Sequence, residues 1–317
     1  MTPRPLGRSG LHVSSLCLGG NVFGWTADEA ASRTVLDRYV AGGGNFVDTA
    51  NVYSMWASGH RGGESEEVIG RWLKKRGRRD DVIVATKVGM DMPGLGAGLK
   101  RSQIERAVDD SLRRLQTDHI DLYYAHADDA ATPLEETLGA FDRLVKAGKV
   151  RTLGASNYTA ARLQEALAVS AREGLARYEC VQPMYNLVDH ADVDETLVPL
   201  CRREDIAIAP YYALASGFLS GKYRKPEDAE GRARGARVKQ YFAHPRGQRI
   251  LDALHAVAAR VGAPPAAVAV AWIVAQPGLT SAIASATSVP QLEESLKAMS
   301  LALDAASLAD LSAAAAP

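Results

Sequence analysis

The chain has 317 residues, of which 47% are hydrophobic and 23% are charged, an ordinary composition for a globular protein with a sizeable core. Lysine plus arginine and aspartate plus glutamate number 37 each, so no net field favours nucleic acid, an anionic membrane or a polyanionic substrate. The three cysteines follow no metal-binding spacing, and the polar N-terminus does not resemble a signal segment. We therefore expect a cytoplasmic protein with reduced thiols and without a metal, a nucleic-acid partner or a membrane span.

The predicted elements begin with a β-hairpin over residues 6–13, which turns at Ser9-Gly10. Apolar strands then alternate with amphipathic helices. The expected strands are 15–18, 45–48, 82–86, 120–125, 150–155, 179–183, 206–210 and 281–285. The expected helices are 28–41, 64–75, 101–115, 133–147, 159–173, 193–204, 247–261, 265–275 and 289–299. Eight alternating units without a break in composition predict one domain, residues 1–317, folded as an α/β (β/α)8 TIM barrel, with a doubly wound sheet as the alternative.

Two segments depart from this repeat. Residues 221–247, between the seventh and eighth strands, are polar and rich in charges and glycine, which predicts a long loop that acts as a lid or is disordered. Residues 302–317 are rich in alanine and predict a C-terminal helix or a frayed tail.

Four polar side chains stand at, or just past, the ends of predicted strands: Asp48, Tyr53, Lys87 and His126. In a barrel of this kind the carboxyl ends of the strands converge on one face, where catalytic residues collect. Each residue alone has an ordinary structural explanation, such as a turn cap or a solvated charge. Their common position at the same face indicates a catalytic site.

The combination also has a chemical logic. Tyrosine, with a pKa near 10, is a poor proton donor at neutral pH, and a neighbouring ammonium such as that of Lys87 is expected to lower that pKa. Asp48 would supply the counter-charge that a buried lysine needs. His126 would donate a hydrogen bond to a carbonyl oxygen. Such a site delivers a proton to an oxyanion and therefore needs a hydride donor.

The chain resembles the aldo-keto reductase family over nearly its whole length. The segments that carry the resemblance are NFVDTANVY (45–53), GGESEEVIGRWL (62–73), VIVATKVG (82–89), IDLYYAH (120–126), TPLEETL (132–138), LVKAGKVRTLGASN (144–157), VQPMYN (181–186) and ALASGFLSGKY (213–223). The resemblance implies a barrel that binds NADPH in an extended form and reduces a small-molecule carbonyl, with Tyr53, Asp48, Lys87 and His126 as catalytic tetrad. NADH is the alternative cofactor, and a non-catalytic, nicotinamide-binding regulatory subunit is the alternative function.

The resemblance also implies the cofactor contacts. In chain order they are Gly20, Asn21, Asp48, Ser156, Asn157, Gln182, Tyr211, Leu214, Ser216, Gly217, Lys222, Ser285, Thr287 and Gln291. Related proteins carry a cation for the adenosine 2′-phosphate in the last strand–helix turn, but residues 285–291 contain no lysine or arginine. The long loop offers Arg232, Arg234, Arg237 and Lys239 instead. We expect Trp25 and Trp56 to wall an apolar substrate pocket, while the substrate itself and the oligomeric state stay open.

Overall fold

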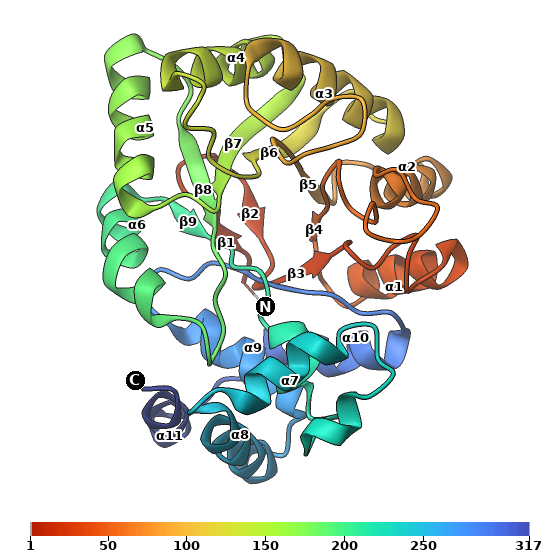
Figure 1. The fold of residues 1–317 in the computed structure, drawn as a ribbon, viewed down its shortest axis with the longest axis vertical. Helices are drawn as coiled ribbons and strands as arrows, with labels where there is room; N and C mark the ends of the chain where they lie inside the picture. Colours follow the sequence, from red (N-terminus) through yellow and green to blue (C-terminus); the bar gives the residue numbers. More distant parts are fainter. Residues whose placement is uncertain (1, 317) are drawn as a thin grey trace.

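The computed structural model describes residues 2–316 and contains one curled sheet of eight parallel strands surrounded by helices (Figure 1). The strands pair in the order β10-β3-β4-β5-β6-β7-β8-β9, and a separate antiparallel hairpin joins β1 to β2. The strands are β1 Arg4–Pro5, β2 His12–Val13, β3 Leu16–Gly19, β4 Phe46–Asp48, β5 Ile83–Val88, β6 Ile120–Ala125, β7 Val150–Ser156, β8 Tyr178–Gln182, β9 Ala207–Ile208 and β10 Ala282–Ala284.

One or more helical segments follow each barrel strand. They are α1 Glu29–Ala41, α2 Glu64–Arg76, α3 Arg101–Leu115, α4 Leu134–Lys146, α5 Ala160–Glu173, α6 Val198–Glu204, α7 Gly235–Ala243, α8 Gly247–Val261, α9 Pro265–Ala275, α10 Val289–Leu296 and α11 Ala305–Ala315. A π-helical turn, Val193–Leu197, leads into α6, and short 3-10 turns cover Ala215–Ser220, Pro226–Ala229 and Lys297–Met299. The (β/α)8 barrel, the N-terminal hairpin and the long excursion between the seventh and eighth barrel strands are thus confirmed.

The amino end of the barrel is closed by the hairpin. Leu6, Leu11 and Val13 pack in one buried cluster with Cys17 and Phe46, which point into the barrel. The interior is tightly filled, since a Cβ atom on Gly154 would lie only 2.4 Å from the ring of Tyr124. Because this end is plugged with apolar side chains, ligands can reach the interior only from the carboxyl ends of the strands.

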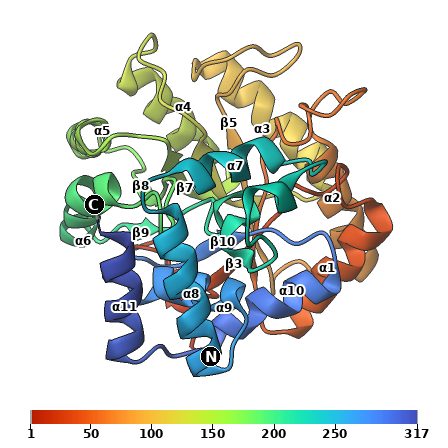
Figure 2. The same cartoon turned by 60° about the horizontal axis from the view of Figure 1, so that its bottom comes forward.

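The barrel closes at a seam between β9 and β10, where few backbone contacts join the two strands. β9 is joined to the segment that leads into β10 by the bridge Ile208–Leu279 and by hydrogen bonds from the Thr280 and Ser281 amides to the Ile208 carbonyl. β10 itself adds a hydrogen bond from the Ile283 amide to the Pro210 carbonyl, 2.9 Å long. The chain leaves the barrel at this seam and returns only after the long excursion. That excursion, residues 221–247, is not structureless, because α7 forms within it and packs on α8 and on the turn Ala215–Ser220 (Figures 1 and 2).

Two further properties bear on the composition-based expectations. All three cysteines, Cys17, Cys180 and Cys201, are buried and unbridged. Among residues 2–316, no single helix has the length and apolar composition to cross a membrane; α8 and α9 taken together pass that criterion, with a bend of 98° between them.

Candidate active site

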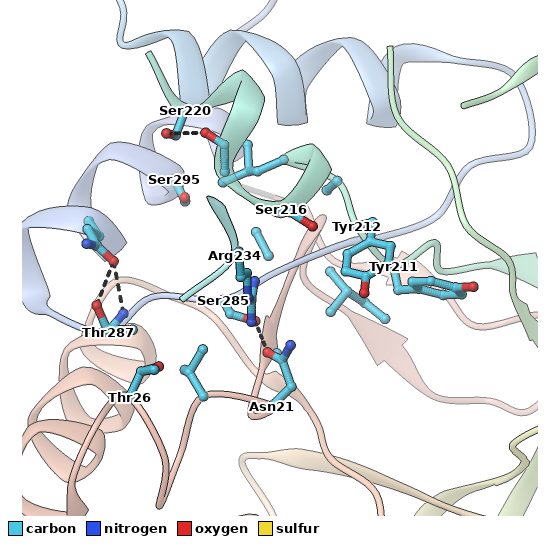
Figure 3. A pocket seen from close by; sticks show the side chains of 18 of the residues that line it. Asn21, Thr26, Tyr211, Tyr212, Ser216, Ser220, Arg234, Ser285, Thr287 and Ser295 are labelled. Atoms are coloured by element: carbon cyan, nitrogen blue, oxygen red, sulfur yellow. Dashed lines mark hydrogen bonds between the residues drawn. The ribbon is translucent and has the colours of Figure 1, made fainter. Parts of the chain in front are cut away.

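A cavity of about 930 Å³ opens at the carboxyl end of the barrel (Figure 3). Every barrel strand delivers at least one lining residue from its end or from the loop that follows. From β3 to β10 these include Asn21, Tyr53, Met90, His126, Ser156, Gln182, Tyr211 and Ser285. All the site residues expected from the sequence line the cavity except two, Lys87 and Gly20. Lys87 lies beneath Tyr53, and Gly20 lets the loop after β3 approach β4, since a Cβ atom there would lie 3.0 Å from the Asp48 carbonyl.

A buried charge cluster forms the base of the cavity. The Lys87 Nζ donates to Asp48 Oδ2 at 2.7 Å and to the Tyr53 hydroxyl oxygen at 2.8 Å. The Tyr53 hydroxyl in turn donates to Asp48 Oδ2 at 3.1 Å. Asp48 and Lys87 end neighbouring strands, β4 and β5, and are 1% and 0% exposed. Tyr53 reaches them from the turn that follows β4. The three groups therefore form one hydrogen-bonded cluster, in which Tyr53 lines the cavity and the two charged groups are buried beneath it.

The protonation of Tyr53 differs from the sequence-based expectation. Burial, followed by the adjacent Asp48 carboxylate, raises the pKa of Tyr53 well above 10, and burial lowers the pKa of Lys87. The expected net lowering of the tyrosine pKa is therefore wrong for this structure. The physical reason is that burial disfavours the phenolate and the Asp48 carboxylate repels it, and together these effects outweigh the attraction of the Lys87 ammonium. Tyr53 is consequently a protonated phenol that can donate its proton.

His126 stands beside the phenol at the end of β6. Its ring centroid lies 6.1 Å from that of Tyr53, and its Nδ1 has no hydrogen-bond partner among residues 2–316. Burial and the nearby Lys87 charge lower the pKa of His126 well below 6.5. The imidazole is therefore neutral and keeps one N–H group for donation. This group can orient an oxygen atom that approaches Tyr53.

The amide and hydroxyl groups on the opposite wall form a connected network. Gln182 Nε2 donates to Asp48 Oδ1 at 2.9 Å, so Gln182 positions the carboxylate from β8. Asn157, in a left-handed conformation with φ 58°, donates to the His126 carbonyl and to Ser156 Oγ. It accepts from the Tyr211 hydroxyl at 2.8 Å. The network presents hydroxyl, amide and aromatic groups to one end of the cavity, which is a donor set that matches a carboxamide on a flat ring.

The turn Ala215–Ser220 lines the cavity beside the Lys222 ammonium. Ala215, Ser216 and Gly217 have successive positive φ angles of 46°, 59° and 98°, and the Ala215 and Gly217 amides donate to the Tyr212 and Leu214 carbonyls within the turn. A Cβ atom at Gly217 would lie 3.2 Å from Lys222 Nζ, so glycine also makes room for that cation.

The cavity wall also carries more cations than carboxylates. Four cationic side chains, none of them in an ion pair among the described residues, line it: Lys222, Arg224, Arg232 and Arg234. Only two carboxylates, Asp48 and Glu294, line it with them. The arrangement fits the diphosphate of a dinucleotide.

The turn after β10 closes the far end of the cavity. Ser285 Oγ donates to Asn21 Oδ1 at 2.5 Å, and Gln291 Oε1 accepts from the backbone and side chain of Thr287 (Figure 3). Four basic residues of the long loop were candidates for binding the 2′-phosphate. Of these, Arg232 and Arg234 line the cavity, whereas Lys239 forms an ion pair with Glu230 at 3.4 Å. Arg237 lines only an outer recess beside α7.

An aromatic wall flanks the reactive groups. The Trp25 and Trp56 rings pack edge to face at 5.5 Å, and Trp56 lies 6.0 Å from Tyr53. Sequence reasoning missed Met90 and Tyr212 on this wall. Met90 follows β5 directly, so the strand-end rule could have found it. Tyr212 has a φ of 60° and packs at 5.1 Å from Tyr211, a placement that depends on the loop conformation and has no local sequence signal.

Among residues 2–316, no group of three or more histidine, cysteine, aspartate or glutamate side chains is arranged to hold a metal ion. The chemistry available to the cavity from its own side chains is therefore proton donation, hydrogen bonding and charge stabilisation.

Comparison with known proteins is consistent with this geometry. The model of the Aldo/keto reductase family matches residues 15–316. An uncharacterized oxidoreductase of Bacillus subtilis, YrpG, is 35% identical over 94% of this chain and 91% of its own length. A probable voltage-gated potassium channel subunit beta of Arabidopsis thaliana is 32% identical over the same shares of both chains. An aryl-alcohol dehydrogenase of Pestalotiopsis microspora is 30% identical over 93% of this chain and 77% of its own length.

The match to the family model spans nearly the whole chain, and the relatives include named oxidoreductases. The observed barrel and its cavity agree with that assignment. The chain belongs to the aldo-keto reductase family, an oxidoreductase family whose members generally use nicotinamide cofactors.

Proposed function

We propose that the protein is an NADPH-dependent reductase that converts an aldehyde or ketone to an alcohol. The observation that carries the proposal is the buried contact of Tyr53 with Lys87 and Asp48 at the base of a cavity large enough for a dinucleotide and a substrate. When bound, the nicotinamide supplies the hydride that this set of side chains lacks.

The residues around the cavity suggest how the cofactor would be held. Ser156, Asn157 and Gln182 offer the hydrogen-bonding groups that a carboxamide needs, and the Tyr211 ring offers a flat face for the nicotinamide. The left-handed turn at Ser216 and the Lys222 ammonium suit the diphosphate. Ser285, Thr287 and Gln291 would then meet the adenosine end.

In the reaction, Tyr53 would donate its hydroxyl proton to the carbonyl oxygen, where negative charge develops during reduction. The Lys87 ammonium, 2.8 Å from the hydroxyl oxygen, stabilises the phenolate that forms. Asp48 favours the charged form of Lys87, and the neutral His126 ring donates a hydrogen bond that orients the substrate oxygen. The high pKa of Tyr53 keeps the proton in place until negative charge develops on the substrate.

The decisive test is Tyr53→Phe, which removes the proton and keeps the ring. We expect turnover of a simple aldehyde to fall by about 10³-fold, because general acid catalysis contributes on that order. Tryptophan fluorescence titration should show NADPH affinity within about threefold of the unchanged protein. A loss of turnover smaller than about tenfold would remove Tyr53 as the proton donor.

Preference for NADPH over NADH rests on Arg224 and Arg232 in the cavity wall, since the turn after β10 lacks a cation. Thr287→Arg places one in that turn, and we expect it to raise the NADPH-to-NADH affinity ratio by about tenfold through a charge-assisted hydrogen bond. The fluorescence titration measures both affinities. An unchanged ratio would mean that the 2′-phosphate lies elsewhere.

A regulatory subunit that binds the nucleotide without turnover is the second candidate. Its support is the similarity to proteins named as potassium channel subunits beta. If the protein is such a subunit, it should bind NADPH tightly, and any aldehyde turnover should be the same in the Tyr53→Phe variant. Single-turnover mixing of the NADPH-loaded protein with an aldehyde separates the two functions.

A further inference from the structure

A recess of about 420 Å³ adjoins the main cavity on its outer side. The recess extends beyond the main cavity to Ala236 and Arg237 near the start of α7. Its other lining residues belong to both: Asn21, Trp25, Trp56, Tyr212, Ser216, Ala233 and Arg234. None of the cofactor positions discussed above requires this extension. It is large enough for an aromatic ring and a polar substituent.

The walls of the recess present aromatic surface that continues from the reactive phenol. The ring centroid of Trp56 lies 6.0 Å from that of Tyr53 and 5.5 Å from that of Trp25. The three rings therefore form a continuous aromatic surface that begins at the phenol. Trp56 is 49% exposed and Tyr212 is 37% exposed, although large apolar side chains are usually covered. Exposed aromatic groups gathered at a cavity mouth are typical of a binding surface for a flat apolar ligand.

Positive charge stands at the far end of this aromatic surface. The Arg234 guanidinium lies 5.8 Å from the Trp25 ring, and that of Arg237 lies 5.8 Å from the Tyr241 ring. Neither forms an ion pair within residues 2–316, and the first turn of α7 contains no acidic residue. Lys239, on the same helix, is paired with Glu230 at 3.4 Å. The unpaired guanidinium groups therefore remain available to an anion.

We propose that the substrate is an aromatic carbonyl compound with an anionic substituent, whose ring packs on Trp25 and Trp56 and whose anion binds Arg237. This inference rests on the proposed function, because it places the carbonyl at Tyr53. Arg237 is chosen over Arg234 because Arg234 also faces the main cavity, where the cofactor diphosphate would bind. Arg237 lines the outer recess and does not line the main cavity.

The test uses 4′-formylbiphenyl-4-carboxylate and its methyl ester, which have the same rings and carbonyl but differ in charge. We expect the unchanged protein to use the acid with a kcat/KM at least tenfold higher, mainly through a lower KM, because the contact is remote from the reacting bond. Arg237→Gln should lower this acid-to-ester ratio by about tenfold, as expected for a lost charge-assisted contact. The matched variant Lys239→Gln, on the same helix, should leave the ratio unchanged.

A second readout does not depend on turnover. Biphenyl-4-carboxylate has no aldehyde to reduce, and its binding to the NADP⁺-loaded protein can be followed by quenching of tryptophan fluorescence. Its dissociation constant should be about tenfold lower than that of its methyl ester. Arg237→Gln should remove that difference. Equal binding of acid and ester, or an acid preference that Arg237→Gln does not change, would overturn the inference.

Failure of the substrate assignment can be distinguished from failure of the proposed reductase function. Turnover of the ester without an acid preference would overturn only the substrate assignment. No turnover of any aldehyde, with the binding preference intact, would overturn the reductase function and leave the anionic aromatic site standing. If Arg237→Gln instead weakens NADPH binding about tenfold and leaves NADH binding unchanged, Arg237 belongs to the cofactor site and the inference is wrong.

Discussion

The two ends of the barrel each bury one carboxylate, but they surround it differently. At the carboxyl end, Asp48 meets a single cation, Lys87, and a phenol that faces the cavity. At the amino end, Asp121 of β6 is also 1% exposed, and it accepts from Arg79 at 2.6 Å, from Arg151 at 2.9 Å and from the Val84 amide at 2.9 Å. The lower cluster thus holds its carboxylate with two guanidinium groups and a backbone amide.

This difference separates a structural clamp from a site that can move a proton. Each Asp121 oxygen is held by arginine, which keeps its proton at any pH that the protein meets. The upper cluster contains groups with displaceable protons, namely the Tyr53 hydroxyl and the Lys87 ammonium, and a neighbouring imidazole with an unpartnered Nδ1. Equal burial of a carboxylate is therefore a poor guide to its role, whereas the acidity of its partners is informative.

Lys87→Met tests the upper cluster most strongly. We expect turnover to fall by about 10³-fold, because the developing phenolate loses its cation. The free energy of unfolding should fall by about 3 kcal/mol, because Asp48 stays buried without a cationic partner. Aldehyde reduction and urea unfolding measure the two effects. A stability loss with turnover within tenfold of the unchanged protein would make Lys87 a structural residue like the arginines below.

Asp121→Asn tests the lower cluster. We expect the free energy of unfolding to fall by about 2 kcal/mol, less than for a fully buried pair because Arg79 and Arg151 still reach water. NADPH affinity and turnover should stay unchanged, because the change lies at the opposite end of the barrel. Asp118→Asn, an exposed neighbour three residues earlier, is the matched control and should cost less than 0.5 kcal/mol, roughly the limit for surface changes. A large loss of turnover in Asp121→Asn would break the distinction between the two ends.

The pH dependence of stability gives the smallest expected effect. Burial holds the pKa of His126 well below its ordinary value of 6.5, so the unfolded chain takes up a proton as the pH falls and the folded one does not. Stability is therefore lost as the pH falls through 6.5, by about 1.4 kcal/mol between pH 7.5 and 5.5. Urea unfolding of the unchanged protein and of His126→Asn should differ by this amount in their pH response. An identical response would show that the pKa of His126 is the same in the folded and the unfolded chain.

The sequence predicts the helices of the barrel well where a clear apolar periodicity marks the segment. The helices at 101–115, 247–261 and 265–275 have the bounds expected from their apolar periodicity. The strand expected at 206–210 is reduced to Ala207–Ile208, because the narrow seam offers it few ladder partners on one side. The helix α7 was missed because its segment is polar and rich in glycine, and its formation depends on packing against α8.

The candidate site is predictable to a different extent in its two parts. The strand-end rule brings Asp48, Lys87 and His126 to one face, and the structure agrees with that placement. The contact of Gln182 with Asp48 crosses the barrel and depends on closure, so no spacing in the sequence reveals it. The electrostatic balance at Tyr53 also escaped prediction. Burial decides its sign, and burial is a property of the folded packing rather than of neighbours in sequence.

The pairing of β3 with β10, the first and last strands of the barrel, has a consequence for how the protein is made. β3 pairs with β10, so the edge of β3 at Leu16 waits for Ala282 before its ladder is complete. At the usual rates of synthesis on the ribosome this wait lasts about 10 to 50 s. During that time the nascent chain exposes an unpaired, apolar strand edge, which is a template for association with other chains. The order of pairing therefore leaves this barrel most exposed to association with other chains before β10 is made.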